Sequence, residues 1–325
     1  MLKASLFLLF CGLLLSLAEY SQAESNTPIC ESYSSSNFNG LNFEIKSYTA
    51  NLKLVKLKNS SEIYVALRTL NTNYQVLIQK NTLETVVVSK GCIKDSKNID
   101  SLSVPGQYGR ILQRSYAPPE PLHNDGVTHS FVARNEYFLT TDLCPSKKPL
   151  DYSFYQNLAT EKRQTPVGIA LSGGWMRSHK LDLDWLKELA KRSLLKITWM
   201  NHSDTHPYKL NTPDSQTFLL TPGVDLKTEV LNAEIQFLKN GILPSVYFRF
   251  PGLISNQEKM HELQQLGLIP LGSSAWLARG DRISAGSIIL VHGNGNEPLG
   301  LSLFNQWIST TKNWFLLKPL INLFD

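Results

Sequence analysis

The sequence is poor in cysteine and has a single long apolar run, and both features narrow what the protein can be. Of the four cysteines, Cys11 lies in the N-terminal apolar run, which leaves Cys30, Cys92 and Cys144. So few cysteines in a long chain exclude a small disulfide-rich scaffold. After residue 23 no apolar segment approaches the ~20 residues that a spanning helix needs, so we expect no membrane anchor in the mature chain.

The excess of positive over negative charge is also small. The formal net charge is +5 over 325 residues, and the basic residues are scattered along the chain, which does not favour a nucleic-acid partner. Hydrophobic residues make up 42% of the sequence, so a substantial core can form, and the length suits two ordinary domains.

The N-terminus has the pattern of a secretory signal peptide. Lys3 precedes the apolar run from Leu6 to Leu17, and Ser21-Gln22-Ala23 follows as a small-residue cleavage site. We therefore interpret residues 1–23 as a signal peptide and expect a secreted or periplasmic protein. In such an oxidising compartment a disulfide between Cys30 and Cys92 fits, because both lie in the same N-terminal segment.

Three further segments follow the signal peptide. Residues 24–104 contain short strand-like runs, including one at Leu41 to Ile45, and predict a β-rich accessory domain that either binds glycan or packs against the main domain. Residues 105–135, with proline at positions 118, 119 and 121, predict a linker without regular structure. Its His123, Asp125 and His129 are interpreted as loop residues rather than as a metal site.

Residues 136–325 alternate short, continuous apolar runs with amphipathic stretches. This pattern predicts an α/β fold whose parallel sheet is covered by helices. Polar residues follow four of the apolar runs: Asp142, His202, Arg249 and His292. In a β/α barrel the carboxyl ends of the strands share one mouth, where active sites lie, so we expect these side chains to converge.

His202 and His206 are four residues apart, and on a helical turn this spacing would put both imidazoles on one face, as in paired metal ligands. Ser203 follows the first histidine, so the motif of zinc proteases is absent. An ion held here would polarise a carbonyl and activate water. Asp142 would take the proton from the water, Arg249 would orient that carboxylate, and His292 would protonate the leaving amine.

Four segments carry a resemblance to a known family: Leu139 to Pro145, the histidine pair, Arg249-Phe250-Pro251-Gly252, and Ile289 to His292. They resemble the polysaccharide deacetylases of carbohydrate esterase family 4, the NodB homology domain. The resemblance implies a distorted (β/α) barrel over residues 136–325 that binds a divalent metal, zinc in the first place with cobalt or manganese as alternatives. It also implies hydrolysis of N-acetyl groups on an amino-sugar polymer, either peptidoglycan or a chitin-like glycan.

The same resemblance assigns roles to individual residues. His202, His206 and Asp142 are similar to the metal ligands, while Asp142, His292 and Arg249 are similar to the catalytic residues. Trp276 resembles the tryptophan that lines the acetyl pocket, and Pro251 belongs to the motif assigned to substrate binding.

Two departures from the family pattern leave alternatives open. Leu143 stands where the family has a second, metal-binding aspartate, so Asp142, Cys144, Asp204 or water must complete the site. Ser273-Ser274 replaces the aspartate before the pocket tryptophan. A glycan-binding module that has lost the chemistry, and an amidase acting on another C–N bond, are therefore alternative functions.

Overall fold

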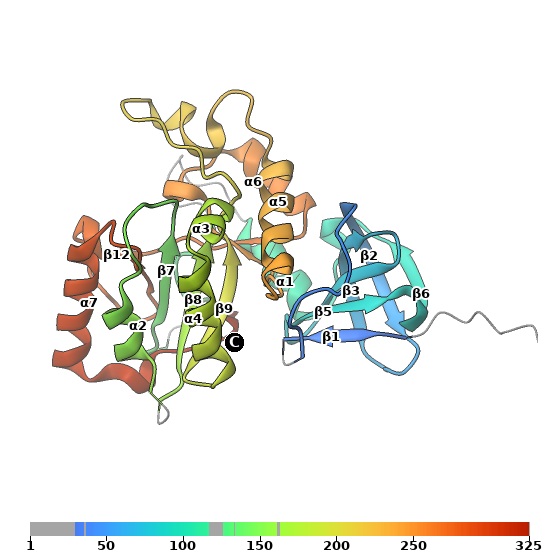
Figure 1. Ribbon diagram of the computed structural model, residues 1–325, viewed down its shortest axis with the longest axis horizontal. Coiled ribbons are helices and arrows are strands. Elements are labelled where there is room, and N and C mark those ends of the chain that lie inside the picture. Colours follow the sequence, from blue (N-terminus) through green and yellow to red (C-terminus); the bar gives the residue numbers. More distant parts are fainter. Residues whose placement is uncertain (1–29, 36, 117–125, 133, 161–162, 325) are drawn as a thin grey trace, which may run out of the picture.

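The computed structural model describes residues 30–35, 37–116, 126–132, 134–160 and 163–324, which form two sheets (Figure 1). The expected signal peptide and two residues of the expected linker, His123 and Asp125, lie outside these ranges. His129 is exposed and bridges to Ser287 through the backbone.

The N-terminal sheet has six antiparallel strands in the order β1-β5-β4-β3-β2-β6. Its strands are β1 (Ser32–Ser34), β2 (Tyr48–Leu57), β3 (Ile63–Leu70), β4 (Tyr74–Gln79), β5 (Thr85–Ser89) and β6 (Ile93–Asn98). Cys30 and Cys92 form the expected disulfide. The strand expected at residues 41–45 is wrong, because Phe43 stacks on Tyr74 instead of entering the ladder.

The second sheet has seven strands in the order β11-β10-β9-β8-β7-β13-β12, and all its pairings are parallel. They are β7 (Phe138–Leu143), β8 (Thr165–Leu171), β9 (Leu195–Asn201), β10 (Tyr247–Phe248), β11 (Ile269–Pro270), β12 (Ala275–Trp276) and β13 (Ile288–His292). The sheet curls into a partial barrel with β11 and β12 at its two ends, which confirms the predicted fold class.

Helices cover the outside of this sheet, as the alternating pattern predicts (Figure 1). They are α2 (Tyr152–Leu158), α3 (Gly173–Ser178), α4 (Lys180–Lys191), α5 (Leu226–Lys239), α6 (Gln257–Gln265) and α7 (Pro298–Thr311). Helix α5 begins after Asp225, whose side chain accepts a hydrogen bond from the amide of Thr228. Among the described residues we find no helix that combines the length and the apolar character needed to cross a membrane.

Side chains of β7 alternate between the two faces of the sheet, as the period of a strand requires. Leu139 and Leu143 are buried in the apolar layer between sheet and helices. Thr140 and Asp142 face the inside of the barrel, where both contact the buried Arg249. The polar site and the apolar layer are thus built from successive residues of one strand.

The segment expected to be an irregular linker contains helix α1 (Gly106–Ser115), so that expectation is wrong for its first third. Tyr108, Ile111 and Leu112 form a buried stripe at helical spacing. This stripe joins residues of both sheets in one apolar cluster, which supplies the burial that keeps the segment helical.

The two sheets lie side by side with α1 and α5 between them (Figure 1). Arg68 of β3 and Glu234 of α5 form a buried ion pair in which Nε donates to Oε2 at 2.7 Å and Nη2 donates to Oε1 at 2.8 Å. The Tyr48 hydroxyl donates to the same carboxylate at 2.9 Å. The β-rich sheet therefore packs firmly against the barrel, one of the two roles considered for it.

Candidate metal and catalytic site

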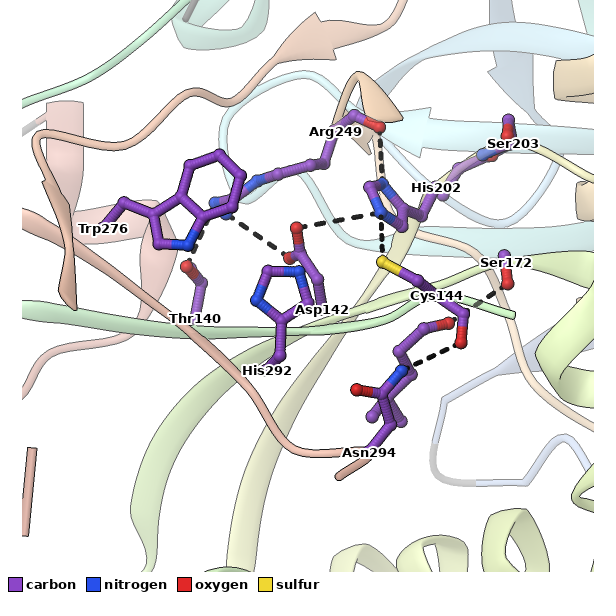
Figure 2. Close-up of polar contacts among 12 residues, drawn as sticks. Thr140, Asp142, Cys144, Ser172, His202, Ser203, Arg249, Trp276, His292 and Asn294 are labelled. Atoms are coloured by element: carbon purple, nitrogen blue, oxygen red, sulfur yellow. Dashed lines mark hydrogen bonds and ion pairs between the residues drawn. The ribbon is translucent and has the colours of Figure 1, made fainter. Parts of the chain in front are cut away.

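Four strand ends bring the predicted polar residues together at one mouth of the barrel (Figure 2). Asp142 is the penultimate residue of β7 and is paired in register with His292, the last residue of β13. His202 and Arg249 each follow the last residue of their strands, β9 and β10. The convergence expected from the sequence is present.

Asp142 is held on the inner side of the barrel by Arg249, whose Nη1 lies 3.4 Å from Oδ1 of the carboxylate. Arg249 is completely buried, and its Nη2 donates to Thr140 Oγ1 at 3.1 Å and to the Gly272 carbonyl at 3.2 Å. These contacts fix the guanidinium, so it can orient the carboxylate.

Beside Asp142 lies a group of three metal-ligating side chains. One ligand atom each from Cys144, His202 and His206 lies within 4.8 Å of the others. The ring Nδ1 of His202 donates to the Arg249 carbonyl at 2.8 Å, so Nε2 carries the lone pair and lies 3.4 Å from Cys144 Sγ. Burial lowers the pKa of His202, which keeps the ring neutral.

The second histidine supports the same interpretation. Nε2 of His206 is buried and has no hydrogen-bond partner in the part of the chain that the structure describes. A buried polar atom without a partner is costly unless a ligand satisfies it. One sulfur and two imidazole nitrogens at this spacing suit a transition metal, so the residues present fit the metal implied by the resemblance.

The histidine pair follows the end of β9 in a loop and does not lie on a helical turn. The residues belong to a loop in which Ser203 and His206 have φ angles of 63° and 48°. Glu229 of α5 holds this loop by accepting from the amides of Asp204 at 3.0 Å and Thr205 at 2.8 Å. The two rings nevertheless lie 4.7 Å apart between centroids. Residues with left-handed backbone angles, which are difficult to predict, bring the two rings together in place of a helical turn.

The group of Cys144, His202 and His206 indicates which side chain completes the histidine pair in place of the missing aspartate. Leu143 is fully buried in the outer apolar layer. Asp204 pairs with Arg177 instead of reaching the histidines. Asp142 Oδ2 is 3.7 Å from His202 Nε2, but Asp142 is outside the group of three. Burial opposes ionisation of Cys144, yet His206 and His292 lower its thiol pKa to about 7.

Next to Asp142, at the end of the neighbouring strand β13, His292 Nδ1 lies 2.7 Å from Glu297 Oε2. Burial alone would lower the pKa of His292, but Cys144, Glu297 and Asp142 outweigh it and raise the pKa well above its ordinary value. This shift favours the protonated ring. Trp276 Nε1 donates to the same carboxylate at 2.8 Å and its indole stacks on His292, with centroids 5.7 Å apart.

Glu297 is the functional candidate that the sequence reasoning missed. It lies five residues after His292, in the glycine-containing loop before α7, and no motif marks it. The Ser273 hydroxyl, in the segment where the family has an aspartate, donates to the Ile288 carbonyl instead. Glu297 thus supplies a carboxylate beside His292 from a different element.

A cleft of about 790 Å³ opens over these groups. Its lining includes the following site residues: Cys144, His206, Trp276, His292 and Glu297. Tyr208 contributes to the wall and is 63% exposed. Pro251, expected to contact substrate, is buried and is not part of the lining, which takes Gly252 and Ile254 from that segment instead. The volume lies in the usual range of small-molecule binding pockets.

No protein-family model matches the chain. Among solved structures, a family 4 carbohydrate esterase from Bacillus anthracis is similar over 68% of this chain and 93% of its own, with 18% identity and a TM-score of 0.47. A peptidoglycan N-acetylglucosamine deacetylase matches over 61% and 91%, with 12% identity and a TM-score of 0.44. A family 4 pseudoenzyme from Bacillus anthracis matches over 57% and 64%, with 12% identity and a TM-score of 0.41. Two of these three structures bear the name of the family that the sequence motifs resemble.

Proposed function

We propose that the protein is an exported, metal-dependent hydrolase that removes N-acetyl groups from an amino-sugar polysaccharide. One observation carries the proposal. The Cys/His/His group lies in the mouth of the barrel beside an oriented carboxylate, Asp142 with Arg249, and an imidazole that contacts a carboxylate, His292 with Glu297. Hydrolysis of an amide needs a base for the attacking water and an acid for the departing nitrogen, both close to an electrophilic centre.

The residues of the chain divide the proton transfers between them. When bound, a divalent ion (zinc in the first place, with cobalt or manganese as alternatives) would polarise the acetyl carbonyl and acidify water. Asp142 accepts the proton that water loses as it attacks the carbonyl carbon. His292 gives its proton to the amide nitrogen as the C–N bond breaks, so that acetate and a free amine result. Arg249 keeps Asp142 correctly placed.

A sugar substrate agrees with the shape and chemistry of the cleft. Trp276 presents an indole fixed by Glu297 beside the acid histidine, in the place where the resemblance puts an acetyl-binding tryptophan. Tyr208 offers a second aromatic surface on the wall. Aromatic faces with a few placed polar groups are what a pocket for a small uncharged group uses. Export is supported by the signal-peptide pattern and by the Cys30–Cys92 disulfide.

The test is acetate release from chitin oligomers and from peptidoglycan, with zinc, cobalt or manganese added. Wild type should release acetate, and Asp142→Asn should lose about 10²–10⁴-fold in rate, the usual contribution of a general base. His261→Ala, which changes an exposed histidine on α6, is the matched control and should keep wild-type rates. No acetate from any substrate, with glycan binding intact, would favour the binding module that buried Leu143 suggests; a different released product would favour the amidase.

A further inference from the structure

We propose that the third metal ligand is the thiolate of Cys144, which makes the site selective for zinc and other soft divalent ions over manganese. The inference rests on the metal site of the proposed function and deepens it. It concerns a residue that differs from the family's aspartate both in chemistry and in position along the strand.

The side chains at the end of β7 point in alternating directions. In the alternation along β7, Leu139 and Leu143 lie in the outer apolar layer, so residue 143 faces away from the mouth. Cys144 comes one residue later and lines the cleft. An aspartate at position 143 would therefore enter the apolar layer. The side chain that this backbone presents to the histidines is that of residue 144.

Hydrogen bonds fix the backbone around Cys144. The Asn294 side-chain amide donates to the Cys144 carbonyl at 2.9 Å, and the Ser172 hydroxyl donates to the Leu143 carbonyl at 3.1 Å (Figure 2). Asn294 is itself fully buried. Partners that lock the backbone of a ligand are typical of built metal sites, where they orient the donor atom.

Both imidazoles have a ring nitrogen that is suited to bind a metal ion. His202 presents a lone pair at Nε2 to Cys144 Sγ, because its proton is on Nδ1, which donates a hydrogen bond to the Arg249 carbonyl. His206 Nε2 is buried without a hydrogen-bond partner among the described residues. An ion held by the sulfur and both nitrogens would satisfy all three atoms. A thiolate favours zinc, cadmium and cobalt, whereas manganese prefers oxygen ligands.

The experiment is metal binding to the purified chain, measured by elemental analysis and by titration of chelator-treated protein with cobalt. A cobalt–thiolate bond gives a charge-transfer absorption band that nitrogen and oxygen ligands do not give. Wild type should bind about one equivalent and show the band. Cys144→Ser should lose the band and weaken zinc binding by more than the ~10–100-fold that a lost supporting residue costs. Cys144→Asp should lose the band and shift preference towards manganese.

The possible results distinguish failure of the ligand assignment from failure of the proposed function. Loss of the band in Cys144→Ser assigns it to Cys144 rather than to another cysteine, and thermal unfolding of each variant shows whether it is folded. Metal bound by wild type without the band, with equal affinity in Cys144→Ser, overturns the inference and leaves the proposed function standing. A band without acetate release from any substrate supports the inference and counts against the function. Absence of metal in wild type overturns both.

Discussion

Restoring the family's second aspartate by Leu143→Asp should destabilise the protein rather than improve its metal site. The side chain of Leu143 is fully buried in the apolar layer, with Leu171 and Trp175 in the same cluster. The carboxylate would enter this layer and not the mouth of the barrel. The substitution therefore distinguishes a residue 143 that faces the apolar layer from one that faces the metal.

The size of the effect follows from the burial. Truncating a fully buried leucine costs about 2–5 kcal/mol. Keeping the carboxyl neutral in an apolar layer adds to this, since a pKa raised by ~3 units costs about 4 kcal/mol at neutral pH. Together these losses approach the whole stability of an ordinary domain, about 5–15 kcal/mol. The penalty should grow as pH rises above about 4, where the unfolded chain ionises and the folded one does not.

Thermal and urea unfolding between acidic and neutral pH measure this loss of stability. Two matched variants serve as controls. Leu143→Asn should be destabilised without the added pH dependence, because it cannot ionise. Leu143→Met keeps the volume and should cost less than about 1.5 kcal/mol. A Leu143→Asp protein as stable as wild type, with tighter manganese binding, would refute the assignment of residue 143 to the apolar layer.

Three further predictions test other parts of the structure. Glu234→Gln leaves Arg68 as an unpaired buried charge and should cost about 3–5 kcal/mol in urea unfolding; an unchanged midpoint would contradict the buried pair. Glu297→Gln removes a group that raises the pKa of His292, so the alkaline limb of kcat/KM, where the acid loses its proton, should move to lower pH; an unmoved limb would exclude His292 as that acid. Treatment with a chelator should abolish acetate release and zinc should restore it, whereas activity that survives complete metal removal would rule out the metal route.

Much of the parallel sheet could be predicted from the sequence, because its strands are continuous apolar runs that end in polar residues. Ile288–His292 is such a run, and its last residue lies where the pattern put it. The same reasoning located Asp142, His202 and Arg249, since parallel strands bring their carboxyl ends to one edge.

The remaining features depend on tertiary contacts that local patterns do not encode. Helix α1 begins after Pro105 and contains two glycines, so its propensity is low, and burial against both sheets stabilises it. The loop of the histidine pair has left-handed residues, and Glu229 of helix α5 holds the amides between them. The choice between Cys144 and Leu143 depends on where β7 ends, and a shift of one residue reverses which side chain faces the mouth.

The buried pair of Arg68 and Glu234 has a consequence for how the molecule unfolds. It joins β3 to α5, and the apolar cluster around it draws residues from both sheets. Separating the sheets would expose that cluster to water and leave two opposite charges without partners. The two sheets should consequently melt in one cooperative transition, and a shortened chain that begins at the barrel would lose part of its own core.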